Sequence, residues 1–205
     1  MKKILIYGDS NTWGDNFITG IRIKDELQWP NILQKKLGNK YKVIGEGLPG
    51  RIAGNFELDK PFKNGIDNFI STFRTCSPID IIIIALGTND LQVKYNRNSE
   101  EIINDLLWYR DSIIEQFSDS DNVCKYFNNE LPRIIYILPP MFDIIKSDGI
   151  FNDISEENRL KLKNLKNKYN DVIVLHSLPL LDDGIHLSIE GHKMLASIVG
   201  DYINE

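Results

Sequence analysis

The stretch IIIIA, residues 81–85, is apolar at every position. A strand with one face in water alternates apolar and polar residues, whereas a strand covered on both faces is a continuous apolar run. We therefore expect residues 79–86 to form a central strand of a parallel sheet, with helices packed against both faces.

Four other short apolar runs and several helical patterns surround this central run. The other runs are residues 3–7, 41–45, 133–138 and 172–175. Apolar residues at helical spacing occupy residues 29–37, 99–117, 155–169 and a last segment that Ser188 can cap. This alternation predicts an α/β fold, a three-layer α/β/α sandwich with a five-stranded parallel sheet of flavodoxin-like type. We expect one domain over residues 1–205, with the longest irregular stretches at residues 48–63 and 118–131.

The composition narrows the class of protein. The formal net charge is −5 and no dense Lys/Arg run occurs, which argues against a nucleic acid or an anionic membrane as the main partner. Cys76 and Cys124 are the two cysteines, too few for a disulfide framework and without the spacing of a thiolate metal site. No run approaches the 18 apolar residues of a membrane span, and we expect a cytoplasmic protein.

Small polar residues follow the first apolar run directly, in GDSNTWGDN at residues 8–16. A phosphate-binding loop is excluded because Gly8 and Gly14 are one residue too far apart and Asp15 stands where lysine is required. A standard nucleophile elbow is excluded because Thr12 replaces its second glycine. Ser10 remains a candidate nucleophile only if a base and an orienting acid reach it.

That base and acid can come from DDGIHLS, residues 182–188. Asp183 lies three residues before His186, so its carboxylate can fold back to the imidazole ring within one turn. The loops after the first and fifth strands open at the same edge of a doubly wound sheet, where Ser10 and His186 could meet. At that edge GTND, residues 87–90, offers the Asn89 amide, and EGLPGR, residues 46–51, offers glycine N–H groups.

Together the four turns resemble the GDSL or SGNH hydrolase family, over residues 3–199, and are closest to its arylesterase branch. The resemblance implies the SGNH hydrolase fold, with Ser10 as nucleophile, His186 as general base and Asp183 as the group that orients His186. It also implies an oxyanion hole formed by the Ser10 and Gly50 N–H groups and the Asn89 side chain. No metal and no organic cofactor are implied.

The expected function is that of a serine esterase, which hydrolyses small-molecule carboxylic esters of short acyl chain through an acyl-serine intermediate. A carbohydrate O-acetylesterase, a lysophospholipase or thioesterase, and acyl transfer to another acceptor remain alternatives. A flavodoxin-like binding domain is the non-enzymatic alternative, but it would have no need of a base beside an oriented acid. A homo-oligomer is also left open.

Several side chains flank the same sheet edge and are candidates for the walls of an acyl or alcohol pocket. They are Trp13, Leu48, Met141, Phe142 and Ile185. His192 follows His186 by six residues, off its helical face, and we expect it to be a solvated helix residue.

Overall fold

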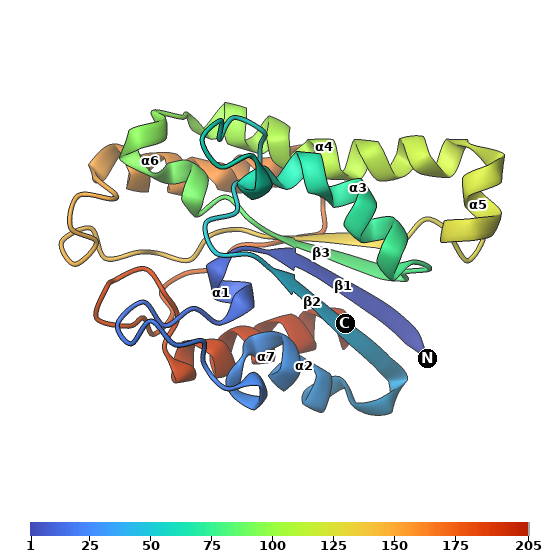
Figure 1. Cartoon of the computed structure of the whole chain (residues 1–205), viewed down its shortest axis with the longest axis horizontal. Coiled ribbons are helices and arrows are strands. Elements are labelled where there is room, and N and C mark those ends of the chain that lie inside the picture. The colour runs from blue at the N-terminus through green and yellow to red at the C-terminus, as the bar shows by residue number, and fades with distance from the viewer. Residues whose placement is uncertain (205) are drawn as a thin grey trace.

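The computed structural model describes residues 1–204, apart from the side chain of Cys124. Five parallel strands form one sheet in the order β2-β1-β3-β4-β5. Figure 1 labels β2, β1 and β3, which lie side by side. The five strands are β1 (Lys2–Gly8), β2 (Tyr41–Gly47), β3 (Ile81–Ala85), β4 (Arg133–Ile137) and β5 (Val172–Ile173). The fold is therefore the expected three-layer α/β/α sandwich.

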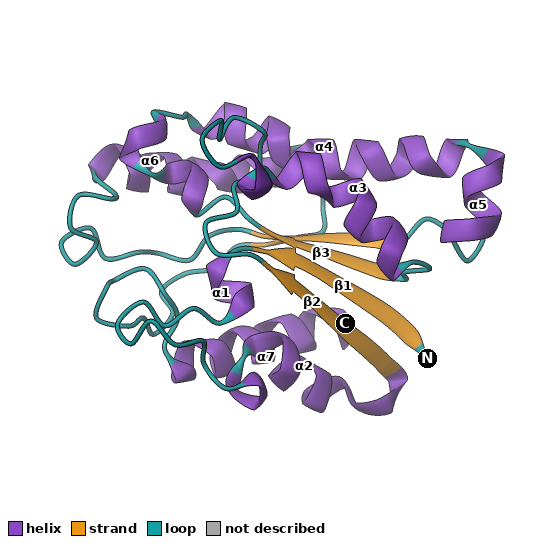
Figure 2. Ribbon diagram, in the orientation of Figure 1, coloured by secondary structure: helices purple, strands orange, loops and turns teal. Residues whose placement is uncertain are grey.

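Helices cover both faces of the sheet (Figure 2). On one side lie α2 (Trp29–Leu37) and α7 (Ile189–Asn204), together with the short α1 (Ser10–Trp13). On the other side lie α3 (Gly65–Cys76), α4 (Ser99–Ser118), α5 (Ser120–Tyr126) and α6 (Asp153–Lys161). Short 3-10 helices are Asp25–Leu27, Gly38–Lys40, Pro61–Lys63, Asn89–Leu91, Val93–Tyr95 and Leu162–Asn167.

The apolar runs divide between the two faces because successive strand residues point to opposite sides. In β1, Ile4 and Ile6 pack with α2 and α7, while Leu5 and Tyr7 pack with α3 and α4. In β3, Ile81 and Ile83 face the α2 and α7 side, and Ile82 and Ile84 face the α3 and α4 side. These four side chains are at most 6% exposed. Two apolar layers therefore sandwich the sheet, as the unbroken run of isoleucines predicts.

Two helical segments differ from the expectation. Residues 118–131 are not irregular throughout, because Asp119 caps α5 by accepting a hydrogen bond from the Asp121 N–H at 2.9 Å. The pattern at residues 155–169 divides into α6 and the 3-10 helix Leu162–Asn167.

The strand order places a topological switch between β1 and β3, since the chain moves outward to β2 on one side and to β4 and β5 on the other. In open α/β sheets, crevices form at such a point, outside the carboxyl ends of the strands. The loops after the strands gather at this end, on the left in Figure 2. No helix among residues 1–204 is long and apolar enough to cross a bilayer.

Candidate active site

Ser10 is the first residue of α1, directly after β1. Asp9 caps this helix by accepting a hydrogen bond from the Asn11 N–H at 2.9 Å, and Gly14 ends it in the left-handed conformation at φ 86°. A Cβ on Gly8 would lie 2.1 Å from Thr12 Oγ1, so the turn can close only over glycine. Burial raises the pKa of Asp9 to about 6, although the hydrogen bond from Asn11 opposes this rise.

The structure brings Ser10, His186 and Asp183 into one hydrogen-bonded chain. His186 Nε2 lies 3.0 Å from Ser10 Oγ, and His186 Nδ1 lies 2.6 Å from Asp183 Oδ2. The other oxygen of Asp183 accepts hydrogen bonds from the backbone N–H groups of Ile185 at 2.9 Å and His186 at 3.0 Å. Asp183 therefore fixes both the ring and the backbone of the histidine turn.

The same contacts keep Asp183 charged. Burial alone would raise the pKa of this carboxyl, but hydrogen bonds from the His186 ring and from the two backbone N–H groups outweigh burial and lower it. An ionised Asp183 accepts a hydrogen bond from the N–H at Nδ1 of His186. The lone pair of His186 Nε2 is then directed at Ser10 Oγ. This arrangement can take a proton from a serine hydroxyl.

A separate contact joins the histidine loop to the serine helix. The backbone N–H of Leu187 donates to Asn11 Oδ1 at 2.8 Å, although the two residues are 176 positions apart. Asn11 directly follows Ser10 in the chain, and Leu187 directly follows His186. The hydrogen bond therefore holds the two loops in register.

Asn89 and Gly50, the other two candidates, lie on adjoining loops. Asn89 Nδ2 donates to the Arg51 carbonyl at 3.0 Å, and Asn89 Oδ1 accepts from Gln92 Nε2 at 2.9 Å. Gly50 has φ 78°, a conformation that favours glycine. One hydrogen of the Asn89 amide remains free of the Arg51 contact, so this amide can still donate to a ligand.

Arg51 and Asp90 hold these loops. The sequence predicts neither the contacts of Arg51 nor the partner of Asp90, a structural residue that is expected to bind N–H groups of its own turn. Arg51 Nη1 donates to the Gly8 carbonyl at 2.9 Å and to the Glu46 carbonyl at 2.6 Å, which joins the ends of β1 and β2. Both oxygens of Asp90 accept from the Ala53 N–H, at 3.0 and 2.8 Å. Burial raises the pKa of Asp90 to about 7, although the Ala53 N–H and Arg97 favour its charged form.

The candidate wall residues fall into two groups. Trp13, Leu48 and Ile185 are half-buried on the loops that carry the serine, the glycine and the histidine. Met141 and Phe142 instead line a cavity of about 630 Å³ that reaches the histidine loop at Gly184 and includes neither Ser10 nor His186 among its lining residues. Met141 is 46% exposed there, whereas the ring of Phe142 is buried.

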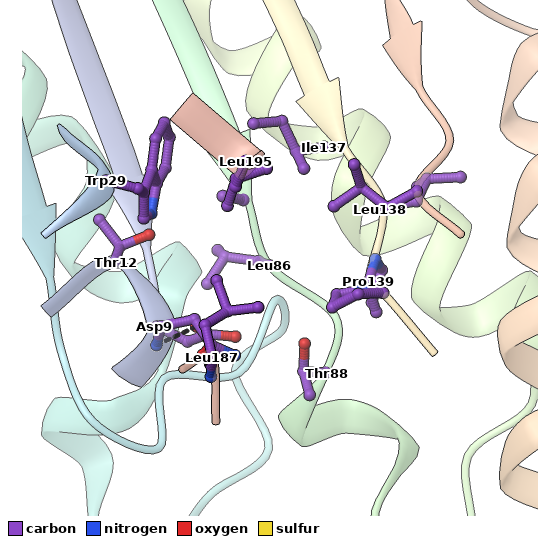
Figure 3. A pocket seen from close by; sticks show the side chains of 14 residues that line it. Asp9, Thr12, Trp29, Leu86, Thr88, Ile137, Leu138, Pro139, Leu187 and Leu195 are labelled. Carbon is purple, nitrogen blue, oxygen red and sulfur yellow. Dashed lines mark hydrogen bonds between the residues drawn. The ribbon is translucent and has the colours of Figure 1, made fainter. Parts of the chain in front are cut away.

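A second, much smaller cavity of about 30 Å³ lies beneath α1. Figure 3 shows Trp29 and Thr12 on one side of it, and Leu138 and Pro139 on the other. Asp9 contributes a carboxylate to its lining. A space of this size accommodates about one water molecule.

His192 corrects the expectation of a solvated residue. It is fully buried, and its Nδ1 accepts a hydrogen bond from the Trp29 N–H at 3.2 Å, which connects α7 to the start of α2. The sequence gives no sign of this contact, because the two residues are 163 positions apart. Within the described residues, no group of three His, Cys, Asp or Glu side chains is arranged to hold a metal ion.

Solved structures resemble this chain, whereas comparisons of its sequence with known proteins find no match. No protein-family model matches the sequence, and no curated protein matches it. The aryl esterase of M. smegmatis superposes with a TM-score of 0.82 at 23% identity, covering 100% of this chain and 99% of that one. Est24, a carbohydrate acetylesterase from Sinorhizobium meliloti, gives 0.83 at 24% identity with the same coverage.

A lipase/acylhydrolase from Enterococcus faecalis is more distant, with a TM-score of 0.67 at 18% identity over 99% of this chain and 95% of that one. The chain thus shares, over its whole length, the α/β fold of the SGNH hydrolases that its four turns resemble. The three named neighbours are ester hydrolases by their names, and of these three the aryl esterase and the carbohydrate acetylesterase have the higher TM-scores.

Proposed function

We propose that this chain is a serine ester hydrolase of the SGNH type, which cleaves small-molecule carboxylic esters with short acyl groups. The observation that carries the proposal is the chain of contacts from Ser10 Oγ through His186 to Asp183, at 3.0 and 2.6 Å. A serine, a base and an orienting acid in that order are the requirements of nucleophilic acyl transfer. A pure binding domain has no use for them.

In the first half of the reaction, Ser10 Oγ forms a bond to the ester carbonyl carbon while its proton passes to His186 Nε2. The negative charge on the carbonyl oxygen is stabilised by the Ser10 and Gly50 N–H groups and by the free hydrogen of Asn89. The bond to the alcohol oxygen then breaks, and His186 returns the proton to this leaving oxygen. An acyl-serine remains.

In the second half, water gives a proton to His186 Nε2 and its oxygen bonds to the acyl carbon. The bond to Ser10 Oγ breaks, the serine regains its proton from His186, and the carboxylic acid leaves. Asp183 stays ionised throughout and stabilises the imidazolium form of His186. The steps balance without a metal or an organic cofactor.

Carbohydrate O-acetyl ester hydrolysis is the second candidate activity, because it uses the same steps and because the fold is as similar to Est24 as to the aryl esterase. We further propose that residues 1–205 form one domain that works in the cytoplasm, in line with a sequence that has only two cysteines, too few for a disulfide framework. A homo-oligomer is compatible with it.

The test compares wild type, Ser10→Ala and His186→Ala on p-nitrophenyl esters from acetyl to long-chain acyl. Wild type should prefer acetyl or butyryl, and each variant should lose at least about 10⁴-fold in kcat because it removes the nucleophile or its base. Ser71→Ala, at an exposed serine of α3, is the matched control and should retain full activity.

Circular dichroism should be unchanged in the inactive variants, and a fluorophosphonate should label wild type but not Ser10→Ala. A Ser10→Ala protein that still turns over a substantial share of the ester would contradict the assignment. A wild-type preference for long-chain esters, with the same inactive variants, would favour a lipase or thioesterase.

A further inference from the structure

A second carboxylate lies beside the candidate histidine. Asp15 Oδ2 is 4.0 Å from His186 Nε2, the nitrogen that also lies 3.0 Å from Ser10 Oγ. The backbone fixes this position, because the Asp15 N–H donates to the Ser10 carbonyl at 3.0 Å. Asp15 therefore has its acidic group on the reacting side of the imidazole, whereas Asp183 contacts the opposite nitrogen.

The Asp15 carboxylate is partly withdrawn from water and is not neutralised by the protein. Its side chain is 24% exposed, and within residues 1–204 no lysine or arginine lies within 4.0 Å of it. Arg22, the nearest arginine along the chain, is already engaged with the Trp13 carbonyl at 2.7 Å and with Gln28 at 3.0 Å. A partly desolvated carboxylate without a cationic partner is suited to bind a cation from outside.

An aromatic ring accompanies this carboxylate on the same loop. Phe17 stacks on the His186 ring with the centroids 6.3 Å apart and the planes 13° from parallel. The residue is nevertheless 69% exposed, so its side chain is available to a ligand at the mouth of the site. The combination of an aromatic ring and a carboxylate is a recurrent way to recognise quaternary ammonium groups.

The position of these two groups determines which part of a substrate they meet. In the proposed reaction, His186 Nε2 donates its proton to the leaving alcohol oxygen, so that oxygen must come within hydrogen-bond reach of Nε2. The alcohol part therefore leaves past Asp15 and Phe17. A cationic group two carbons beyond the ester oxygen can reach the carboxylate without disturbing the acyl part.

We propose that Asp15 and Phe17 form a subsite for a cationic group on the alcohol part, and that amino-alcohol esters are the preferred substrates. The proposal rests on the esterase function proposed above and adds the substrate class. The cation gains Coulomb attraction from Asp15 and contact with the aromatic face of Phe17. A neutral alcohol of the same shape gains only the apolar contact.

Two esters of nearly the same shape, one cationic and one neutral, provide the test. In 2-(trimethylammonio)ethyl acetate a quaternary nitrogen occupies the place that a quaternary carbon has in 3,3-dimethylbutyl acetate. Wild type should favour the cationic ester in kcat/KM by roughly fivefold or more, the size expected for a partly screened charge pair with an added cation–π contact. Asp15→Asn should lower this ratio by slowing the cationic ester, and only the part of the ratio that Phe17 contributes should remain.

Two further variants separate the subsite from general electrostatics. Asp182→Asn removes a carboxylate that is 93% exposed on the histidine loop and pairs with Lys146 at 3.8 Å, and it should leave the ratio unchanged. Phe17→Leu keeps an apolar side chain but removes the aromatic face, so it should lower the ratio of kcat/KM for the cationic ester to kcat/KM for the neutral ester.

Equal kcat/KM for the two esters in wild type would overturn the cation subsite, with the esterase function intact. An equal loss of kcat/KM on both esters in Asp15→Asn would also overturn it. Asp15 would then act on His186 in the hydrolysis of every ester rather than bind a cation. Inability of wild type to cleave either ester while it cleaves p-nitrophenyl acetate overturns the subsite alone. Failure on p-nitrophenyl acetate as well rejects the esterase function and the subsite together.

Discussion

Asn89 has an amide with two hydrogens, of which the Arg51 carbonyl takes one at 3.0 Å. In the proposed reaction the second amide hydrogen donates to the developing oxyanion. Asn89→Ala therefore removes a hydrogen bond that is strongest in the transition state. We expect kcat on p-nitrophenyl acetate to fall by about 10²–10³-fold, with a much smaller change in KM. Steady-state kinetics of wild type and Asn89→Ala at matched enzyme concentration measures kcat and KM separately.

Gln92→Ala provides the matched control for this prediction. Gln92 Nε2 holds the oxygen of the Asn89 amide at 2.9 Å, so its loss frees the amide to rotate without removing the donor. Its effect on kcat should be well below that of Asn89→Ala. A kcat within about tenfold of wild type in Asn89→Ala would exclude Asn89 from the oxyanion hole.

At the scale of elements, the end of β2 supports the helix that carries Ser10. A Cβ on Gly47 would lie 2.2 Å from the Trp13 nitrogen and 2.7 Å from the Trp13 Cα, and both are backbone atoms that cannot rotate away. Gly47→Ala must therefore displace α1. A displacement of about 1 Å at the nucleophile can lower the rate about 10²-fold, and we expect a loss of that order in kcat/KM.

Gly45→Ala on the same strand is the control. Two residues earlier on the same face, its Cβ would lie 3.1 Å from Pro30 Cβ, a side-chain atom of α2 rather than the backbone of α1. It should lower the free energy of unfolding in urea slightly and leave kcat/KM near wild type. If Gly47→Ala and Gly45→Ala have the same activity, the contact between β2 and α1 does not position Ser10.

The elements differ in how far the sequence could predict them. The five strands and α2 follow from local patterns, since an unbroken apolar run or a 3.6-residue spacing needs no knowledge of distant residues. The i−3 spacing of Asp183 and His186 is equally local. The contacts of Arg51 with Gly8, of Asp90 with Ala53 and of Asp15 with His186 were missed because they join segments far apart in the chain.

For the whole molecule, the layer formed by α2 and α7 contains an acid-sensitive contact. His192 accepts the Trp29 N–H through Nδ1, and its buried Nε2 has no hydrogen-bond partner among the described residues. Burial, with a smaller contribution from the charge of His186, lowers the pKa of His192 to about 4. Protonation in place would turn Nδ1 into a donor that faces another donor.

The sign of the pH dependence follows from where the proton binds. An unfolded histidine has a pKa near 6.5, so between about pH 6.5 and pH 4 the unfolded chain takes up a proton that folded His192 does not. The free energy of unfolding should therefore decrease as the pH falls through this range, by up to about 1.4 kcal/mol per pH unit from this group. Above this range the contribution of His192 is constant.

His192→Gln isolates this contribution because glutamine can still accept the Trp29 N–H but does not titrate. The raised pKa values of Asp9 and Asp90, about 6 and 7, act in the opposite direction, since these carboxyls bind protons more readily when folded. Both carboxyls are present in wild type and in His192→Gln. Their contributions therefore cancel to first order in the difference between the two free energies of unfolding. Urea unfolding across the range should show that the stability difference between wild type and His192→Gln becomes smaller as the pH falls. A constant difference between wild type and His192→Gln would mean that His192 titrates alike in both states, and that the α2–α7 contact is insensitive to acid.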